Sequence, residues 1–275
     1  MTGGRRSLYL PNGLTAYAVA YLMVLYLPVV FIPLFSFNDA QTAAFPLVGF
    51  TTKWYAILSS IDAMHDALWN SLGVAVSTAV LSTVLGIFAA RGLTRYRVPG
   101  HGGILGFIML PLVLPEIMVA ISLLVVLLQF GVKLSLVSVT LGHILLAMPF
   151  ATAVLMSSFE GFDKSLEEAS ADLGETPMWT FLRVTLPIVA PGIVASLLIT
   201  FTISLDEFII AFFLSGTDPT LPVYIWSQLR FPARLPSTLA LGSILLFASF
   251  LLLCAAELFR RRMAKRVGQA DGGYL

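Results

Sequence analysis

Six long runs of apolar, charge-poor residues restrict this chain to a membrane fold. They cover residues 14–35, 68–90, 104–130, 134–158, 188–214 and 239–258. A hydrocarbon core of about 30 Å needs roughly 20 helical residues, and each run is long enough. The runs lack the alternation of barrel strands, and lipid cannot hydrogen-bond exposed peptide groups. We therefore predict an all-α membrane protein with six transmembrane helices.

Composition agrees with this fold class. The chain is 58% hydrophobic and 11% charged, whereas soluble domains carry about 25% charged residues. A net charge of +1 gives no field that would attract nucleic acid, so the expected surroundings are membrane lipid. We treat residues 1–275 as a single transmembrane domain.

The basic residues orient the helices. If both termini are cytoplasmic, twelve Lys and Arg residues lie on that side and four lie outside, as the positive-inside rule requires. The cytoplasmic set is Arg5, Arg6, Arg91, Arg95, Arg97, Lys164, Arg183, Arg260, Arg261, Arg262, Lys265 and Arg266, and the external set is Lys53, Lys133, Arg230 and Arg234. We therefore predict cytoplasmic termini and one long cytoplasmic loop, residues 159–187.

Two residues that often carry chemistry have ordinary explanations in this sequence. The single cysteine, Cys254, lies in an apolar run, where we expect it to pack as a small hydrophobic residue. His143 is expected to hydrogen-bond between helices, because no other His, Cys or acid stands at metal-ligand spacing. We expect neither a metal site nor a catalytic residue.

The loop 159–187 carries the signals of a first short helix. Ser165 is predicted to cap it with Glu168 as the reciprocal partner, and Gly174 is predicted to end it in a left-handed conformation. Its apolar face would hold Leu166, Ala169 and Leu173, with Glu167 and Asp172 pointing elsewhere. Such an amphipathic helix can dock onto another protein, although capping alone also accounts for Glu168 and Gly174.

A second short helix is predicted directly after the first. Thr176 can serve as its N-cap with Pro177 in the first helical position. Pro187 is predicted to mark a break before the fifth apolar run. The loop thus contains two helices joined by a tight turn.

The same loop resembles the EAA loop of the permeases of ATP-binding-cassette importers. That pattern is Glu-Ala-Ala, three residues, Gly, nine residues, then Ile-x-Leu-Pro. This chain has Glu168-Ala169-Ser170, Gly174 and Val184-Thr185-Leu186-Pro187 at matching spacing. Ser170 and Val184 depart from the pattern by small volume changes. The resemblance extends from about the second to the sixth run.

The resemblance implies a fold, a set of partners and a location. The fold would be that of a type I importer permease in a bacterial inner membrane. Its partners would be a second permease, two copies of an ATPase subunit that bind ATP and Mg, and an extracytoplasmic solute-binding protein. The loop would couple to the ATPase through Glu168, Ala169, Gly174, Leu186 and Pro187. The sequence has no Gly-x-x-x-x-Gly-Lys-Ser/Thr run of its own to cradle ATP phosphates.

Three carboxylates lie well within the apolar runs, where no Lys or Arg neutralises them, whereas a fourth, Glu257, stands at the cytoplasmic edge of the last run and can reach water or the basic tail. The three are Glu116, Asp206 and Glu207. A charge at membrane depth costs roughly 2.5–3.5 kcal/mol on insertion scales, so each is a candidate for lining a substrate pathway. Pro111 and Pro115 should bend or interrupt the third run close to Glu116. The ordinary alternatives are a protonated Glu116 bonded to a neighbouring helix, and wet interfacial carboxylates at Asp206 and Glu207.

Within the importer permeases, Ser204-Leu205-Asp206-Glu207 with Gly216 and Thr220-Leu221-Pro222 resembles the branch that imports spermidine and putrescine. The resemblance implies a small cationic solute. Tyr224 and Trp226 could contribute cation-π contacts, although aromatic residues are also enriched at membrane interfaces.

Two other classes of function remain open at this point. An ion-gradient-driven transporter or channel would use Glu116 and Asp206, but it would leave the loop unexplained and would favour internal repeats. A membrane-embedded enzyme is disfavoured, because His65, His101 and His143 do not assemble a nucleophile with a base or a metal cluster.

Overall fold

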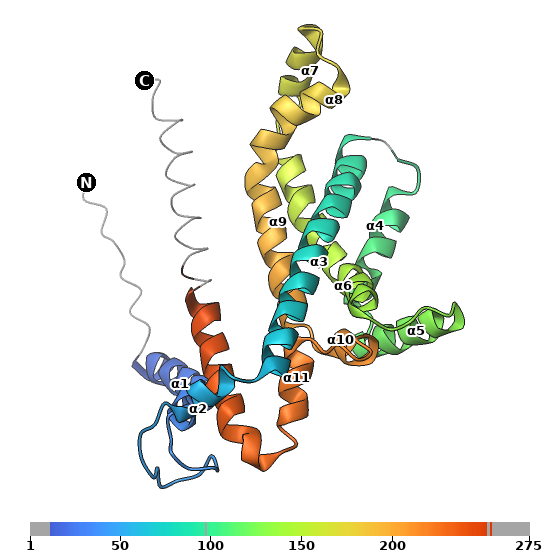
Figure 1. Cartoon of the computed structure of the whole chain (residues 1–275). Helices are drawn as coiled ribbons and strands as arrows, with labels where there is room; N and C mark the ends of the chain where they lie inside the picture. The colour runs from blue at the N-terminus through green and yellow to red at the C-terminus, as the bar shows by residue number, and fades with distance from the viewer. Residues whose placement is uncertain (1–11, 97, 252–253, 255–275) are drawn as a thin grey trace, which may run out of the picture. The chain divides into compact units, whose positions relative to one another are not determined.

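The computed structural model describes residues 12–96, 98–251 and 254, and these residues are almost entirely helical (Figure 1). Within that part, the one extended pairing outside helices is an isolated bridge between Asn38 and Phe50. Five helices are long and apolar enough to cross a membrane, or six if one bent pair counts as a span. The all-α membrane fold is confirmed. The described residues divide into two compact units, 12–61 with 228–251 and 62–227.

The first unit contains the first and last apolar runs. Helix α1, Asn12–Ser36, matches the first run. The last run is helical over Pro232–Leu251, and most of its remaining residues lie outside the described part of the chain. A short helix α2, Lys53–Leu58, lies in the connection after α1, where the buried Trp54 donates its Nε1–H to the Asn38 carbonyl at 2.8 Å.

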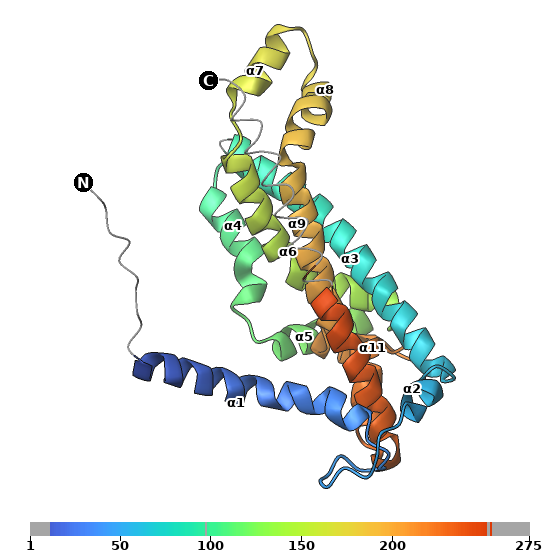
Figure 2. The same cartoon turned by 90° about the vertical axis from the view of Figure 1, so that its left-hand side faces the viewer.

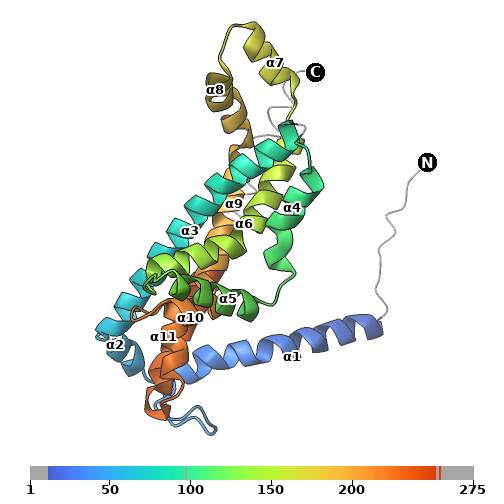
Figure 3. The same cartoon turned by 90° about the vertical axis from the view of Figure 1, so that its right-hand side faces the viewer.

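Three long helices form the core of the second unit. They are α3, Asp62–Arg95; α6, Leu136–Glu160; and α9, Leu186–Asp206, and they run side by side in Figures 2 and 3. Small residues let them approach closely, as membrane helices require in the absence of a hydrophobic driving force between them. Thr83 of α3 and Ser196 of α9 hydrogen-bond across the contact at 3.0 Å.

The third apolar run is a broken span. Helix α4, His101–Met109, continues into the 3-10 turn η1, Leu110–Leu112, and α5, Glu116–Gln129, then leaves at 100°. The predicted interruption near Pro111 and Pro115 is confirmed. The bend follows from these prolines, which withhold backbone N–H donors there.

The fifth apolar run is also broken. Helix α9 ends at Asp206, and a separate helix α10, Ile209–Leu214, follows after an extended residue at Glu207. The predicted single span over 188–214 is therefore wrong at its outer end. A further helix absent from the prediction, α11, Leu221–Gln228, follows in the connection. Its start is tied to α3, where the Leu221 N–H donates to Ser71 Oγ at 2.7 Å.

The loop between α6 and α9 forms a helical tip at the far end of the bundle from α5 and α10 (Figure 1). It contains α7, Ser165–Asp172, and α8, Pro177–Thr180. Gly174 ends α7 with φ +87°, as predicted. Its N–H donates to the Ala171 carbonyl at 2.9 Å and the next N–H, of Glu175, donates to the Ser170 carbonyl at 3.2 Å. This is the paired Schellman pattern that a left-handed glycine permits.

Two details of this tip differ from the sequence prediction. Ser165 is the first helical residue rather than the cap, and its N–H donates to Asp163 Oδ1 at 3.0 Å. Hydrogen bonds from the backbone and the side chain of Ser165 hold the pKa of the exposed Asp163 below its usual range. The predicted break at Pro187 is replaced by a π-helical segment η2, Phe181–Thr185, so that Pro177–Asp206 is one continuous helix of 30 residues. Pro187 directly follows this π-helical segment, whose altered backbone hydrogen bonding lets the helix continue through the proline.

The contact between α6 and α9 gives a test of this packing. A Cβ on Gly192 would lie 1.9 Å from Ser158 Oγ, so Gly192→Ala should destabilise the protein by about 1–3 kcal/mol through overpacking. Gly73→Ala is the matched control, because nothing lies within 4 Å of its Cβ. Thermal unfolding in detergent should show a lower Tm for Gly192→Ala alone, with partial recovery in Ser158→Gly/Gly192→Ala. Equal Tm values for the two single variants would contradict the close approach.

Candidate functional site

A cavity of about 850 Å³ lies where the two broken spans meet α6. The broken ends supply its polar groups, since Glu116 begins α5 and both Asp206 and Glu207 stand at the end of α9. The other ten lining residues are apolar, namely Pro111, Leu112, Leu114, Pro115, Ile117, Leu146, Phe150, Ile203, Phe208 and Ile209. The structure thus brings together the three carboxylates that the sequence singled out, and no Lys or Arg is among the lining residues.

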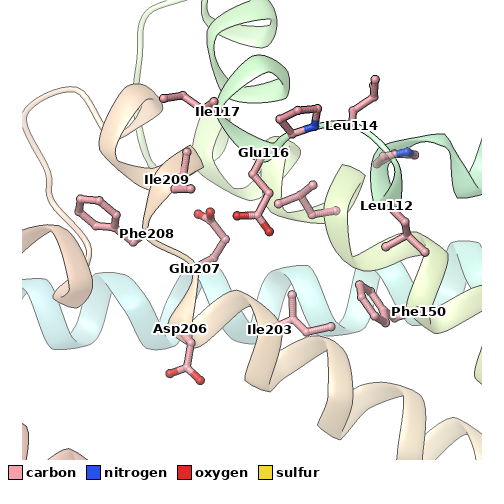
Figure 4. Close-up of a pocket in the computed structure, with 13 residues that line it drawn as sticks. Leu112, Leu114, Glu116, Ile117, Phe150, Ile203, Asp206, Glu207, Phe208 and Ile209 are labelled. Carbon is pink, nitrogen blue, oxygen red and sulfur yellow. The ribbon is translucent and has the colours of Figure 1, made fainter. Parts of the chain in front are cut away.

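Figure 4 shows how the three carboxylates are directed. Those of Glu116 and Glu207 turn toward one another across the cavity, whereas that of Asp206 points to the other side of the α9–α10 break. Glu116 and Asp206 are exposed, and Glu207 is buried. Two facing carboxylates repel one another unless a cation or a proton lies between them.

Glu207 is held firmly by its surroundings. Its carboxylate accepts hydrogen bonds from the Ile210 N–H at 3.0 Å and the Ala211 N–H at 3.2 Å, which are free donors of the first turn of α10. His143 Nε2 of α6 lies 3.2 Å from Glu207 Oε2. The side chain therefore satisfies the backbone at the break, a role that was not among the alternatives considered from sequence.

The two aromatic candidates do not line the cavity directly. Tyr224 is buried, and Trp226 packs on the ring of Phe208 with centroids 5.5 Å apart. Phe208 itself lines the cavity. Trp226 can thus act on the cavity through Phe208, while the role suggested for Tyr224 stays a prediction. Among the described residues, no group of three or more His, Cys, Asp or Glu side chains could hold a metal ion.

At the opposite end of the bundle, Glu167 joins the helical tip to α3. Its carboxylate lies 3.4 Å from Arg95 Nη2 and 3.8 Å from Arg91 Nη1, and it accepts a 2.5 Å hydrogen bond from Thr185 Oγ1. The Arg95 side chain is nearly buried, at 7% exposed. One carboxylate therefore links α7, the π-helical segment and the last turns of α3.

Aromatic rings complete this anchor. Arg91 lies over the ring of Phe181 at 4.3 Å, and Arg95 lies over that of Phe162 at 4.8 Å. The predicted second apolar run ended at residue 90, before both arginines, and Glu167 was predicted to point away from the apolar face of its helix. The signal available in the sequence was the spacing of Arg91 and Arg95, four residues apart on one helical face.

The residues carried over from the EAA pattern lie mainly on the exposed side of the tip. Glu168, Ala169, Gly174 and Pro187 are exposed, and Leu186 is half-buried. Apolar side chains are exposed beside them, with Leu173 at 87% and Met178 at 67%. This exposed tip, which we define as Leu166, Glu168, Ala169, Leu173, Met178 and Trp179, has the composition of a protein-docking surface.

Ser170, which departs from the EAA pattern, faces inward. Its Oγ lies 3.0 Å from Thr180 Oγ1 in a buried hydrogen bond between α7 and α8. Alanine could not make this bond. The serine at position 170 therefore has a hydrogen-bond partner, Thr180, in the next helix.

Comparisons with known proteins agree with this architecture. Residues 82–265 match the family described as the binding-protein-dependent transport system inner membrane component. The chain is 32% identical over 250 residues to the spermidine/putrescine transport system permease protein PotC of Escherichia coli K12, covering 90% of this chain and 94% of that protein. It is also 32% identical over 225 residues to the molybdenum transport system permease protein ModB of Haemophilus influenzae, covering 75% of this chain and 97% of that protein.

A solved structure shares the fold. A chain of a bacterial ABC transporter involved in the import of the acidic polysaccharide alginate superposes with a TM-score of 0.71, covering 93% of this chain and 99% of that chain at 15% identity. At this identity the likeness concerns the fold alone.

The anchor at Glu167 can be tested against its neighbour. Glu167→Ala should destabilise the protein by about 1.5–3 kcal/mol, the usual worth of hydrogen bonds to charged groups. Glu168→Ala, an exposed change in the next residue, should stay within about 0.5 kcal/mol of wild type. Thermal unfolding in detergent measures both. A Glu168→Ala variant as unstable as Glu167→Ala would contradict the assignment of the anchor.

Proposed function

Because the chain belongs to the family of binding-protein-dependent transport system inner membrane components, we propose that it forms half of the pathway through which an importer moves a polyamine such as spermidine or putrescine. As a member of that family the chain is a multi-pass permease subunit of an ATP-binding-cassette importer. This replaces the alternative of an ion-gradient-driven transporter or channel.

The acidic cavity carries the substrate proposal. Identity alone does not choose between the relatives, since PotC and ModB are equally identical over their matched lengths. The cavity combines facing carboxylates with apolar walls and two aromatic rings, Phe150 and Phe208. A polyamine presents ammonium groups separated by methylene chains, so it matches both the charge and the apolar lining.

Partner subunits supply the energy in this proposal. The chain has no phosphate-binding loop of the Gly-x-x-x-x-Gly-Lys-Ser/Thr type, so ATP and Mg are bound and ATP is hydrolysed by two copies of an ATPase subunit. A second permease completes the pathway, and an extracytoplasmic binding protein delivers the solute. The exposed tip seats in the ATPase on the cytoplasmic side, where its apolar side chains become covered.

The long helix Pro177–Asp206 transmits movement in this proposal. At 1.5 Å per residue its 30 residues span about 45 Å. One end carries α8 of the exposed tip, and the other end carries Asp206 beside the cavity. A displacement of the tip by the ATPase therefore reaches the carboxylates along a single helix, while Glu167 holds the tip to α3.

Neutralising the facing carboxylates tests the substrate proposal. In proteoliposomes that hold the complete importer, Glu116→Gln and Glu207→Gln should each slow uptake of labelled putrescine by about 10- to 100-fold, as loss of a charged hydrogen bond predicts. Asp206→Asn should have a smaller effect, because its carboxylate points away from the other two. Unchanged uptake in both Gln variants would overturn the cation pathway.

Changing the exposed tip tests the coupling proposal. Leu173→Asp and Glu168→Arg place charge on the docking surface, so uptake should be lost although the complex still binds its loaded solute-binding protein. Lys164→Asp, outside the exposed tip as defined, is the control and should retain uptake. If Leu173→Asp assembles with the ATPase and transports normally, the tip is not the coupling surface.

A further inference from the structure

His143 is a buried ionisable side chain that the proposed pathway has not yet used. It lies in the N-terminal half of α6 and is 1% exposed. Its Nδ1 lies 2.7 Å from Ser204 Oγ of α9, and its Nε2 lies 3.2 Å from Glu207 Oε2. The ring therefore touches the last turn of α9 with one nitrogen and the α9–α10 break with the other.

The partners of the two ring nitrogens of His143 indicate which nitrogen carries the proton. An ionised carboxylate accepts hydrogen bonds and donates none, so the favourable arrangement puts a proton on Nε2. The Nδ1 of a neutral ring then accepts from the Ser204 hydroxyl. Nδ1 is hydrogen-bonded to Ser204, whereas Nε2 lies within ion-pair distance of Glu207 without completing a hydrogen bond, so its contact with the carboxylate is electrostatic.

Glu207 needs such support more than its two companions do. It is the buried member of the three, and its carboxylate must both cap α10 and face Glu116 across the cavity. The backbone donors of Ile210 and Ala211 hold it from the α10 side. His143 is the side chain that holds it from α6, across the core of the bundle.

We propose that His143 is a positioning residue, which acts with Ser204 to hold the Glu207 carboxylate at the α9–α10 break so that it faces Glu116. This inference rests on the proposed function for its meaning in transport, because Glu207 is the group that would touch the solute. Through His143, α6 would also fix the position of the end of α9.

Carbodiimide labelling tests the positioning without any solute. A hydrophobic carbodiimide is applied to the complete importer in proteoliposomes, and modification of Glu207 and Glu116 is quantified by mass spectrometry. In His143→Ala the ratio of Glu207 to Glu116 labelling should rise about fivefold, the equivalent of losing a polar contact worth about 1 kcal/mol. His143→Gln offers an amide donor and acceptor and should restore a ratio near wild type.

Thr202→Ala is the matched control for a change in the same region. Thr202 is exposed on α9 and its hydroxyl bonds within its own helix, to the Leu198 carbonyl at 2.9 Å. In Thr202→Ala the ratio of Glu207 to Glu116 labelling should equal that of wild type. A general loosening of the fold would raise labelling of both glutamates together and would not be rescued by Gln, and that result would overturn the positioning role.

Putrescine uptake by the same vesicles separates the two proposals. Uptake should fall in His143→Ala and recover in His143→Gln. If wild-type vesicles take up no putrescine but the labelling ratios follow the prediction, the polyamine assignment fails and the positioning role stands. If the Glu207 to Glu116 ratio in His143→Ala equals that of wild type, the positioning role fails whatever the solute.

Discussion

The bilayer interior offers no water to a freed peptide group, so each break in a spanning helix must be satisfied from within the protein. In the described part of this chain two spans are broken, and the breaks lie where these spans meet. At the first break Pro111 and Pro115 remove donors, and at the second the Glu207 carboxylate accepts from the Ile210 and Ala211 N–H groups. The carboxylates of the cavity therefore owe their position to the breaks.

The opposite end of the bundle is held in place by a different kind of interaction. The helical tip lies beyond the bundle, and one carboxylate, Glu167, holds it to Arg91 and Arg95 of α3. The neighbouring residue, Glu168, is exposed. Adjacent residues on a helix point about 100° apart, so one glutamate anchors the tip while the next stays exposed. The long helix Pro177–Asp206 connects the tip to the cavity.

Most of the fold and the two short helices of loop 159–187 could be predicted from sequence. The apolar runs are long enough to identify as spans, and the spacing of the EAA residues is specific. The apolar runs, the bend near Pro115 and the left-handed Gly174 follow from local rules. The break after Asp206 has no proline or glycine to announce it, because a side chain rather than a missing donor produces it. Pro187 was wrongly predicted to mark a break, because the π-helical segment directly before it lets the helix continue. The partners of Glu167 and His143 are distant in sequence and required the structure.

In the proposed mechanism, Pro177–Asp206 moves as one rod that carries force from the tip to the cavity. Spin labels at Met178 and Thr202, both exposed on this helix, should lie about 36 Å apart along it. Pulsed electron paramagnetic resonance on the complete importer should give the same Met178–Thr202 distance before and after ATP binding, while the distance from Thr202 to a label at Val113 changes. A Met178–Thr202 distance that shifts with ATP, or a Thr202–Val113 distance that stays constant during transport, would contradict movement of this helix as a rigid rod.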